Sequence, residues 1–187
     1  MKKILFIVNL IAFIGAGECL AQGQLVSRNV LLSFFSSAPI EDIKAETKTG
    51  YSILDLQTNN IYFKVDIRSF KFRKGLMQEH FNENYMESDK YPYAEFKGKI
   101  KEPVDFSKDG TYDVTVIGDL LLHNVKQNYS AKAVLSIKNG NISGSSNFPV
   151  KLVDHNIKIP TLLIKNIAEV VQVTVNVTYE NTLAKKM

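Results

Sequence analysis

Cysteine is nearly absent from this chain, because Cys19 is the only one among 187 residues. No intramolecular disulfide bond can form, so the stability of the fold must come from its hydrophobic core. The sequence also lacks a GxSxG nucleophile motif, a glycine-rich phosphate loop and a haem-attachment motif. These absences remove the sequence support for serine-hydrolase, nucleotide-binding or haem-binding chemistry.

A concentrated basic face is also missing. The 23 lysines and arginines alternate along the chain with 19 acidic residues, and the formal net charge is +4. Nucleic-acid-binding domains gather their basic residues on one stripe or patch, so nucleic acid is not an expected partner. No low-complexity tract, interdomain linker or fixed-period repeat is visible, which predicts one folded domain.

The chain opens with MKKILFIVNLIAFIGAGECLAQ. Two lysines precede an apolar run at residues 4–16, and Cys19 and Ala21 place small residues at the −3 and −1 positions of a cleavage site. This pattern is typical of a secretory signal peptide, and the run is too short to span a bilayer stably. We expect a signal peptide at residues 1–21 and a mature domain at residues 22–187.

A lipoprotein signal is the alternative interpretation of this segment, with Cys19 carrying the lipid. Glu18 precedes Cys19, at a position where such a signal needs a small residue. Cleavage after Ala21 is therefore the preferred prediction, and it would remove the only cysteine. The mature protein is expected to be periplasmic or secreted, in a bacterium.

The remaining sequence alternates between apolar and polar residues. In residues 60–72, Ile61, Phe63 and Val65 share one face, and the residues between them are polar or tyrosine. This period of two is typical of half-buried antiparallel strands. The same pattern is strong in residues 111–123, 128–138 and 169–180, and weaker in residues 27–38, 40–48, 50–56, 93–101 and 147–154. About eight short strands separated by turns predict a sandwich or a barrel.

Strong curvature favours the barrel. The apolar positions fall on odd numbers through Ile67 and on even numbers at Phe70, and this phase slip predicts a β-bulge near residues 68–69. Gly98 and Gly118 lie on apolar faces, where a glycine permits a bend or leaves space. A membrane-spanning barrel is the alternative, but the polar face carries many long charged side chains. We therefore expect the apolar face to be the interior.

Residues 75–88 have helical rather than strand periodicity. Met77, Phe81 and Tyr85 are spaced by four, and Pro92 then prevents the helix from continuing. The pattern predicts a short helical lid or crossover. Its apolar residues either plug one end of the core or form the wall of a cavity, and the sequence leaves both interpretations open.

A metal site is the alternative interpretation of the same segment. Glu79 and Glu83 are four residues apart and flank His80, so a metal-assisted hydrolase could be built from these three residues. No second histidine lies nearby, however, and the helical zinc motif has two. Acidic residues on a short exposed helix are more often a solvated face, so no metal and no cofactor are predicted.

Taken in order, four stretches resemble the YceI-like domain family. They are SFFSSAPIEDIKAETKTGYSILDLQTNNIYFKVDIRSFKF, LMQEHFNENYMESDKYPYAEFKGKI, GTYDVTVIGDLLLHNVKQ and FPVKLVDHNIKIP. The resemblance implies an eight-stranded, lipocalin-like antiparallel barrel whose apolar interior holds a long isoprenoid chain, such as a polyprenyl lipid or a quinone tail. Two positions depart from many relatives: Asn124 stands where they have glycine, and the residues before His80 lack their arginine and aspartate.

The predicted function is an exported lipid-binding protein that carries, stores or protects an apolar chain, with transient contact with a membrane or a membrane enzyme. Small residues on an inward face, Ala131 and Ala133, would leave room for that chain. The alternatives are the metal-assisted hydrolase and a ligand-free interaction or stress protein with a packed core. The predicted ligand-binding residues are Phe63, Val65, Phe70, Phe72, Met77, His80, Phe81, Phe96, Val114, Val116, Ala131 and Ala133.

Overall fold

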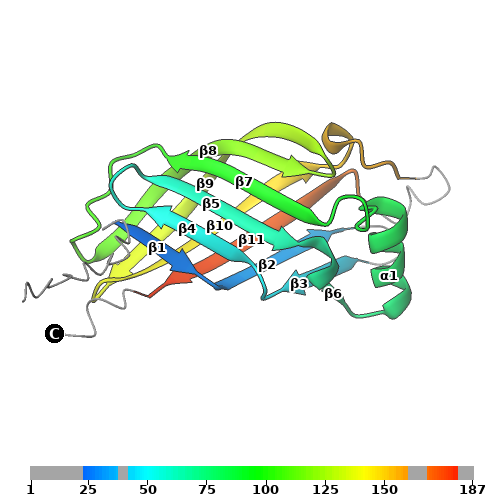
Figure 1. The fold of residues 1–187 in the computed structure, drawn as a ribbon, viewed down its shortest axis with the longest axis horizontal. Helices are drawn as coiled ribbons and strands as arrows, with labels where there is room; N and C mark the ends of the chain where they lie inside the picture. The colour runs from blue at the N-terminus through cyan, green and yellow to red at the C-terminus, as the bar shows by residue number, and fades with distance from the viewer. Residues whose placement is uncertain (1–22, 38–41, 160–167, 181–187) are drawn as a thin grey trace, which may run out of the picture.

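The computed structural model describes residues 23–37, 42–159 and 168–180. The predicted signal peptide, residues 1–21, lies outside the described residues. The described strands form one antiparallel sheet that curls around an interior (Figure 1). The predicted all-β antiparallel class is therefore confirmed. None of the described helices is long and apolar enough to cross a membrane.

Eleven strand segments make up the sheet. They are β1 (Gln24–Ser27), β2 (Asn29–Ser36), β3 (Ile43–Thr47), β4 (Tyr51–Asp55), β5 (Asn60–Asp66), β6 (Lys71–Phe72), β7 (Tyr93–Ile100), β8 (Gly110–Leu122), β9 (Val125–Lys138), β10 (Asn141–Lys151) and β11 (Val170–Tyr179). Their order in the sheet is β1-β4-β5-β7-β8-β9-β10-β11-β2-β3-β6. Neighbours from β7 to β11 follow one another in sequence, which is the expected result of hairpin connections.

The sheet closes because one stretch of chain pairs on both sides. Only Arg28 separates β1 from β2. β1 pairs with β4, whereas β2 pairs with β11. Residues 24–36 therefore join the two sides of the sheet and complete a barrel, which leaves few backbone groups of these strands without a partner.

The count of eleven segments differs from the predicted eight strands. The difference comes from three breaks: Arg28 between β1 and β2, residues 48–50 between β3 and β4, and residues 67–70 between β5 and β6. Joining the segments across these breaks gives eight longer strands. Residue alternation can reveal the strands, but it carries little information about where a strand is interrupted by a short break.

The predicted β-bulge at residues 68–69 is wrong. These residues form a 3₁₀ turn, η1 (Ile67–Ser69), in which the Asp66 side chain accepts a hydrogen bond from the Arg68 amide at 2.9 Å. The hydroxyl of Ser69 donates to the Asp66 carbonyl at 2.6 Å. A helical turn changes the phase of the side chains as a bulge would, and it lets both Ile67 and Phe70 be buried.

The helical segment lies within the predicted range 75–88, and we call residues 75–88 the lid. It consists of α1 (Gly75–His80) and a π-helical turn, η2 (Phe81–Tyr85), at one end of the barrel (Figure 1). The lid ends firmly, because Met86 and Ser88 are buried and the Ser88 hydroxyl donates to the Asn82 side-chain oxygen at 3.0 Å. Its start is looser, since α1 has no buried residue and no side-chain N-cap.

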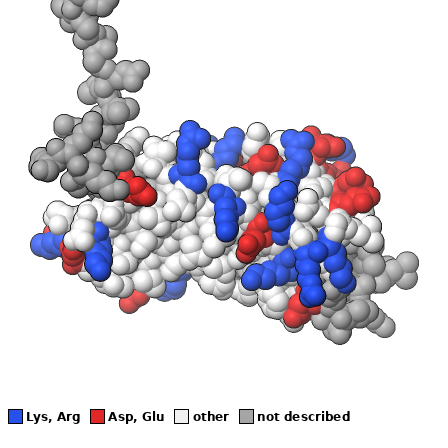
Figure 2. All heavy atoms as spheres, turned by 90° about the horizontal axis from the view of Figure 1, so that it is seen from below, with Lys and Arg blue, Asp and Glu red and all other residues white. Residues whose placement is uncertain are grey.

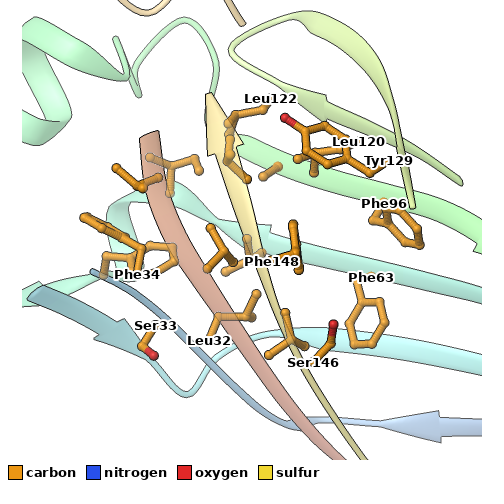
Figure 3. Close-up of a pocket in the computed structure, with 18 of the residues that line it drawn as sticks. Leu32, Ser33, Phe34, Phe63, Phe96, Leu120, Leu122, Tyr129, Ser146 and Phe148 are labelled. Atoms are coloured by element: carbon orange, nitrogen blue, oxygen red, sulfur yellow. The ribbon is translucent and has the colours of Figure 1, made fainter. Parts of the chain in front are cut away.

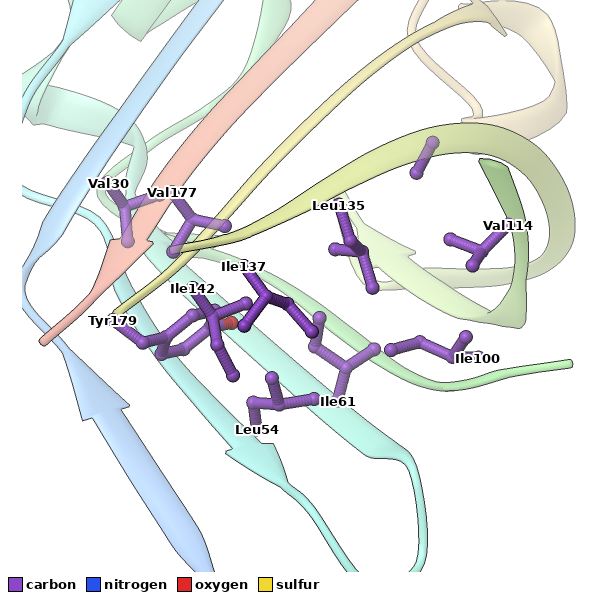
Figure 4. Close-up of a cluster of buried hydrophobic side chains, with 11 residues drawn as sticks. Val30, Leu54, Ile61, Ile100, Val114, Leu135, Ile137, Ile142, Val177 and Tyr179 are labelled. Carbon is purple, nitrogen blue, oxygen red and sulfur yellow. The ribbon is translucent and has the colours of Figure 1, made fainter. Parts of the chain in front are cut away.

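The opposite end of the barrel is closed by packed side chains. Figure 4 shows residues such as Leu54, Ile142 and Tyr179 converging there from different strands. Tyr179 is fully buried, and its hydroxyl lies 2.5 Å from that of Ser52. Because Ser52 donates to the Tyr62 carbonyl, Tyr179 is the donor to Ser52. Burial raises the pKa of Tyr179. This cluster forms a solid floor.

Gly98 and Gly118 pair with each other across β7 and β8. A Cβ atom on Gly118 would lie 2.4 Å from the Gly98 Cα and 2.8 Å from the ring of Phe96. The two glycines therefore make room for the Phe96 ring, which lies over them on the inner face. The space predicted at these glycines is filled by the protein itself.

Candidate ligand-binding cavity

A cavity of about 430 Å³ lies inside the barrel. Its floor includes Ile61, Ile100 and Leu135, which belong to the closed-end cluster. Its other end is lined by Ser36 and Val171, at the ends of β2 and β11, and by the lid. We call this second end the mouth. The volume of the whole cavity is typical of small-molecule sites. It does not fit the alternative of a fully packed core.

Small side chains on three strands create this space. Ala94 on β7, Ala131 on β9, and Gly144 and Ser146 on β10 all line the cavity. Figure 3 shows larger side chains around the same space, among them Leu32, Phe63, Leu120 and Phe148. A close-packed interior would need large residues at the small positions, so the sequence itself leaves the cavity open.

Several polar groups within the barrel wall are already bonded to one another or to the backbone. The Tyr129 hydroxyl donates to Nε2 of His155 at 2.9 Å, because Nδ1 of His155 donates to the Val125 carbonyl at 3.1 Å. The Ser146 hydroxyl donates to the Lys132 carbonyl at 2.7 Å. The wall therefore offers a hydrocarbon surface, and an apolar ligand can contact it without leaving these groups unsatisfied.

Two polar side chains on the lid differ from the bonded ones in the wall, because no described residue forms a hydrogen bond with them. His80 and Tyr85 line the cavity, and neither has a hydrogen-bond partner among the described residues. Burial raises the pKa of the Tyr85 hydroxyl, which therefore remains a proton donor at neutral pH. Lys64 and Glu95 also border the cavity, but they pair with each other at 3.1 Å. Polar recognition is thus available near the lid.

Phe81 attaches the lid to the barrel through aromatic contacts. Its ring centroid lies 4.9 Å from that of Phe72, 5.4 Å from that of Phe34 and 6.0 Å from that of Phe70. All four rings line the cavity. Tilted and stacked aromatic pairs at these distances are attractive beyond their buried area. The lid is therefore part of the cavity wall, and moving it would open the interior.

A second attachment joins the end of the lid to the β8–β9 hairpin. Oε2 of Glu87 lies 3.2 Å from Nε2 of His123, and Nδ1 of His123 lies 3.1 Å from the His155 carbonyl. Glu87 and His123 both have positive φ, 42° and 49°, which is uncommon for residues with side chains. A hydrogen bond from Lys90 lowers the pKa of the Glu87 carboxyl, and His123 adds to this effect. We call the Glu87–His123 contact the latch.

Eleven of the twelve residues predicted to bind ligand line the cavity: Phe63, Val65, Phe70, Phe72, Met77, His80, Phe81, Phe96, Val116, Ala131 and Ala133. Val114 does not line it. It is buried in the closed-end cluster, because its position on β8 faces inward below the cavity floor. Contact of the other eleven residues with a ligand remains a prediction.

The residues of the alternative metal site do not converge. His80 lines the cavity, whereas Glu79 and Glu83 are exposed on the outer side of the lid. Among the described residues, no group of three or more histidine, cysteine, aspartate or glutamate side chains could hold a metal ion. The arrangement gives the hydrolase hypothesis no support.

Sequence reasoning missed much of the wall contributed by β2, β10 and β11. These strands place Leu32, Phe34, Phe148, Val173 and Val175 on the cavity. The alternation on β11 did identify its inward face, so the same rule applied to all strands would have found these residues. It could not show which inward residues lie beside the cavity and which lie in the solid floor.

Comparisons with known proteins agree with this geometry. The sequence model that describes the YceI-like domain family matches residues 35–179 of this chain. A polyisoprenoid binding domain from Saccharophagus degradans, implicated in plant cell wall breakdown, has a similar structure. Its TM-score is 0.71 at 15% identity, covering 84% of this chain and 98% of that one.

Two further solved structures are similar. BcnA of Burkholderia cenocepacia gives a TM-score of 0.68 at 13% identity, covering 80% of this chain and 95% of that one. The YCEI protein of Campylobacter jejuni gives 0.61 at 17% identity, with 78% and 89% covered. At such identities these structures establish the fold only. No curated protein sequence matches the chain. On the family match over residues 35–179, the chain belongs to the YceI-like domain family.

Proposed function

We propose that the protein is exported and binds one long apolar chain, of the isoprenoid or quinone-tail class, inside the barrel for carriage, storage or protection. One observation carries this proposal: a cavity of about 430 Å³ enclosed by hydrocarbon side chains, with a closed floor and a lid at its mouth. The structurally similar protein described as a polyisoprenoid binding domain supports the choice of ligand class.

Burial of the chain supplies the binding energy. Each methylene moved from water into an apolar site gains about 0.8 kcal/mol, so about ten methylenes would gain roughly 8 kcal/mol before the costs of association are subtracted. The affinity should then increase about fourfold for each added methylene until the cavity is full. Such a site distinguishes ligands by the length and cross-section of the chain more than by their functional groups.

The polar end of the ligand is expected near the lid. The floor is a packed apolar cluster, whereas His80 and Tyr85 near the mouth have no partner among the described residues. A hydroxyl, carbonyl or phosphate group could accept a hydrogen bond from either side chain. Burying it at the floor would leave it unsatisfied. The apolar tail therefore enters first and the polar head stays at the mouth.

The proposal is tested by titrating the protein with prenyl alcohols of increasing length, from farnesol to geranylgeraniol and longer homologues. Binding is measured by displacement of a fluorescent apolar probe. Ala131→Trp fills the cavity from β9, and Ser130→Trp places the same side chain on the outer face of the same strand. Circular dichroism and thermal unfolding show whether both variants remain folded.

We expect wild type and Ser130→Trp to bind longer alcohols more tightly, and Ala131→Trp to lose at least about tenfold in affinity. A folded Ala131→Trp variant that binds every alcohol as well as wild type would contradict the proposal. An affinity that does not change with chain length would contradict it as well.

A further inference from the structure

Exposed apolar side chains concentrate at the mouth of the barrel. Eight large hydrophobic residues of the described chain are exposed. Four of them, Phe35, Leu76, Val153 and Val170, belong to segments at the mouth end, and we call these four the rim. Val153 and Leu76 are the most exposed of the eight, at 70% and 62%. Burying such side chains in a folded protein is favourable, so their exposure around an opening needs an explanation.

The rim residues come from neighbouring segments rather than from scattered positions. Phe35 on β2 is paired in register with Gln172 on β11, two residues from Val170. Val170 is paired with Lys151, and Val153 follows in the turn η3 (Val153–His155) after β10. Leu76 lies on α1, and α1 and η3 both lie at the right-hand end in Figure 1. The rim thus borders the mouth from the strand ends and from the lid.

Basic side chains accompany the rim. Lys44 is paired in register with Phe35, and Lys151 with Val170. Arg73 and Lys71 lie just before Leu76, are exposed, and have no ion-pair partner among the described residues. Figure 2 shows basic side chains grouped towards the lid end of the molecule, with some acidic ones among them.

Acidic residues in the same region limit the electrostatic contribution. Glu79 on the lid, Asp154 in η3 and Glu169 before β11 are all exposed. The basic excess at the mouth is therefore small. Apolar insertion must supply most of any attraction to a lipid surface, with the basic residues adding a preference for anionic lipid.

We propose that the rim docks the mouth of the barrel onto a lipid bilayer, so that an apolar chain passes between membrane and cavity without crossing water. This inference rests on the proposed function, because only a chain held in lipid requires such a route. The orientation agrees with the ligand pose: the tail leads into the barrel while the polar head stays at the mouth, at the level of the lipid head groups. Apolar side chains next to basic ones are the combination that binds membrane interfaces.

The test measures flotation of the protein with vesicles of phosphatidylcholine, and of phosphatidylcholine with phosphatidylglycerol. Leu76→Glu/Val153→Glu removes the two most exposed rim residues. Val26→Glu/Ile117→Glu is the matched control, because both are exposed hydrophobic residues on β1 and β8, away from the mouth. All four positions are on the surface, so both double variants should fold.

We expect wild type and the control variant to float with vesicles, more strongly when phosphatidylglycerol is present, and the rim variant to lose at least about tenfold in vesicle affinity. The rate of uptake of a vesicle-bound polyprenol should fall by a similar factor. Equal flotation of the rim and control variants, or no flotation of wild type, would overturn the inference. Dimerisation of wild type that the rim variant abolishes would identify a second copy as the occupant instead.

A parallel titration with farnesol in solution separates the two proposals. Farnesol is short enough to reach the cavity from water, so the rim variant should bind it with unchanged affinity. If farnesol and longer alcohols fail to bind wild type, the proposed function is wrong whatever the vesicles show. If farnesol binds but vesicles do not, the docking inference alone fails.

Discussion

At the scale of single residues, the cavity depends on where small side chains stand on the inner face. Ala94 and Ala131 line the cavity, whereas Gly98 and Gly118 face the ring of Phe96. Composition does not distinguish these cases, because each is a small residue at an inward position. The difference lies in the neighbour across the strand pair, which only the three-dimensional register supplies.

His155 is a residue for which burial predicts a pH dependence of stability. It is fully buried, and burial lowers the pKa of its imidazole from the ordinary value of 6.5. Below about pH 6.5 the unfolded chain takes up a proton that the folded protein resists, so stability is lost as the pH falls from there through the lower folded pKa. At higher pH the imidazole is neutral in both the folded and the unfolded protein, so His155 no longer makes the free energy of unfolding depend on pH.

We therefore expect the free energy of unfolding to decrease between about pH 7 and pH 5, by at most about 1.4 kcal/mol per pH unit for one proton. Urea unfolding at several pH values measures it. His155→Gln should remove this part of the dependence while lowering stability throughout. The same slope in both proteins over this range would show that another group is responsible.

At the scale of elements, the sequence predicts the strands and the lid well and the breaks poorly. Alternation identifies the inward faces of β5, β8, β9 and β11, because each has one apolar and one polar side. The phase slip near Arg68 indicated a distortion but not its kind, since a bulge and a 3₁₀ turn shift the pattern alike. The latch was unpredictable, because Glu87 and His123 are 36 residues apart and neither position has a periodic signal.

The latch should control how readily the lid opens. Glu87→Gln keeps the size of the side chain but removes the carboxylate charge from the contacts with His123 and Lys90. We expect amide hydrogen exchange at Met86 and Ser88 to quicken by roughly threefold to tenfold, which corresponds to losing about 0.5–1.5 kcal/mol. Bound prenyl alcohol should be released faster by a similar factor.

Glu83→Gln is the matched control for this experiment. Glu83 lies in the same lid, is exposed, and has no hydrogen-bond or ion-pair partner among the described residues. Its exchange and release rates should equal those of wild type. Equal rates in the Glu87 and Glu83 variants would mean that the packing of Phe81 and Met86 holds the lid without help from the latch.

At the scale of the whole molecule, the barrel has two unlike ends. One end is closed by the cluster around Leu54, Ile142 and Tyr179, and the other carries the lid and the exposed rim (Figures 1 and 4). The packed end contributes to the stability of the fold. The end with the lid gives a ligand access to the cavity. The sequence predicted the barrel, and all but one of the predicted ligand-binding residues line the cavity. It did not predict this division, because both ends are built from the same alternating strands.

The most direct test of the central claim is native mass spectrometry of the protein after incubation with vesicles containing a long polyprenol, followed by removal of the vesicles. We predict a mass shift equal to one polyprenol in wild type and none in a folded Ala131→Trp variant. Organic extraction should recover the same lipid. An empty wild-type protein, or equal loading of both proteins, would contradict the claim that the barrel cavity holds a long apolar chain.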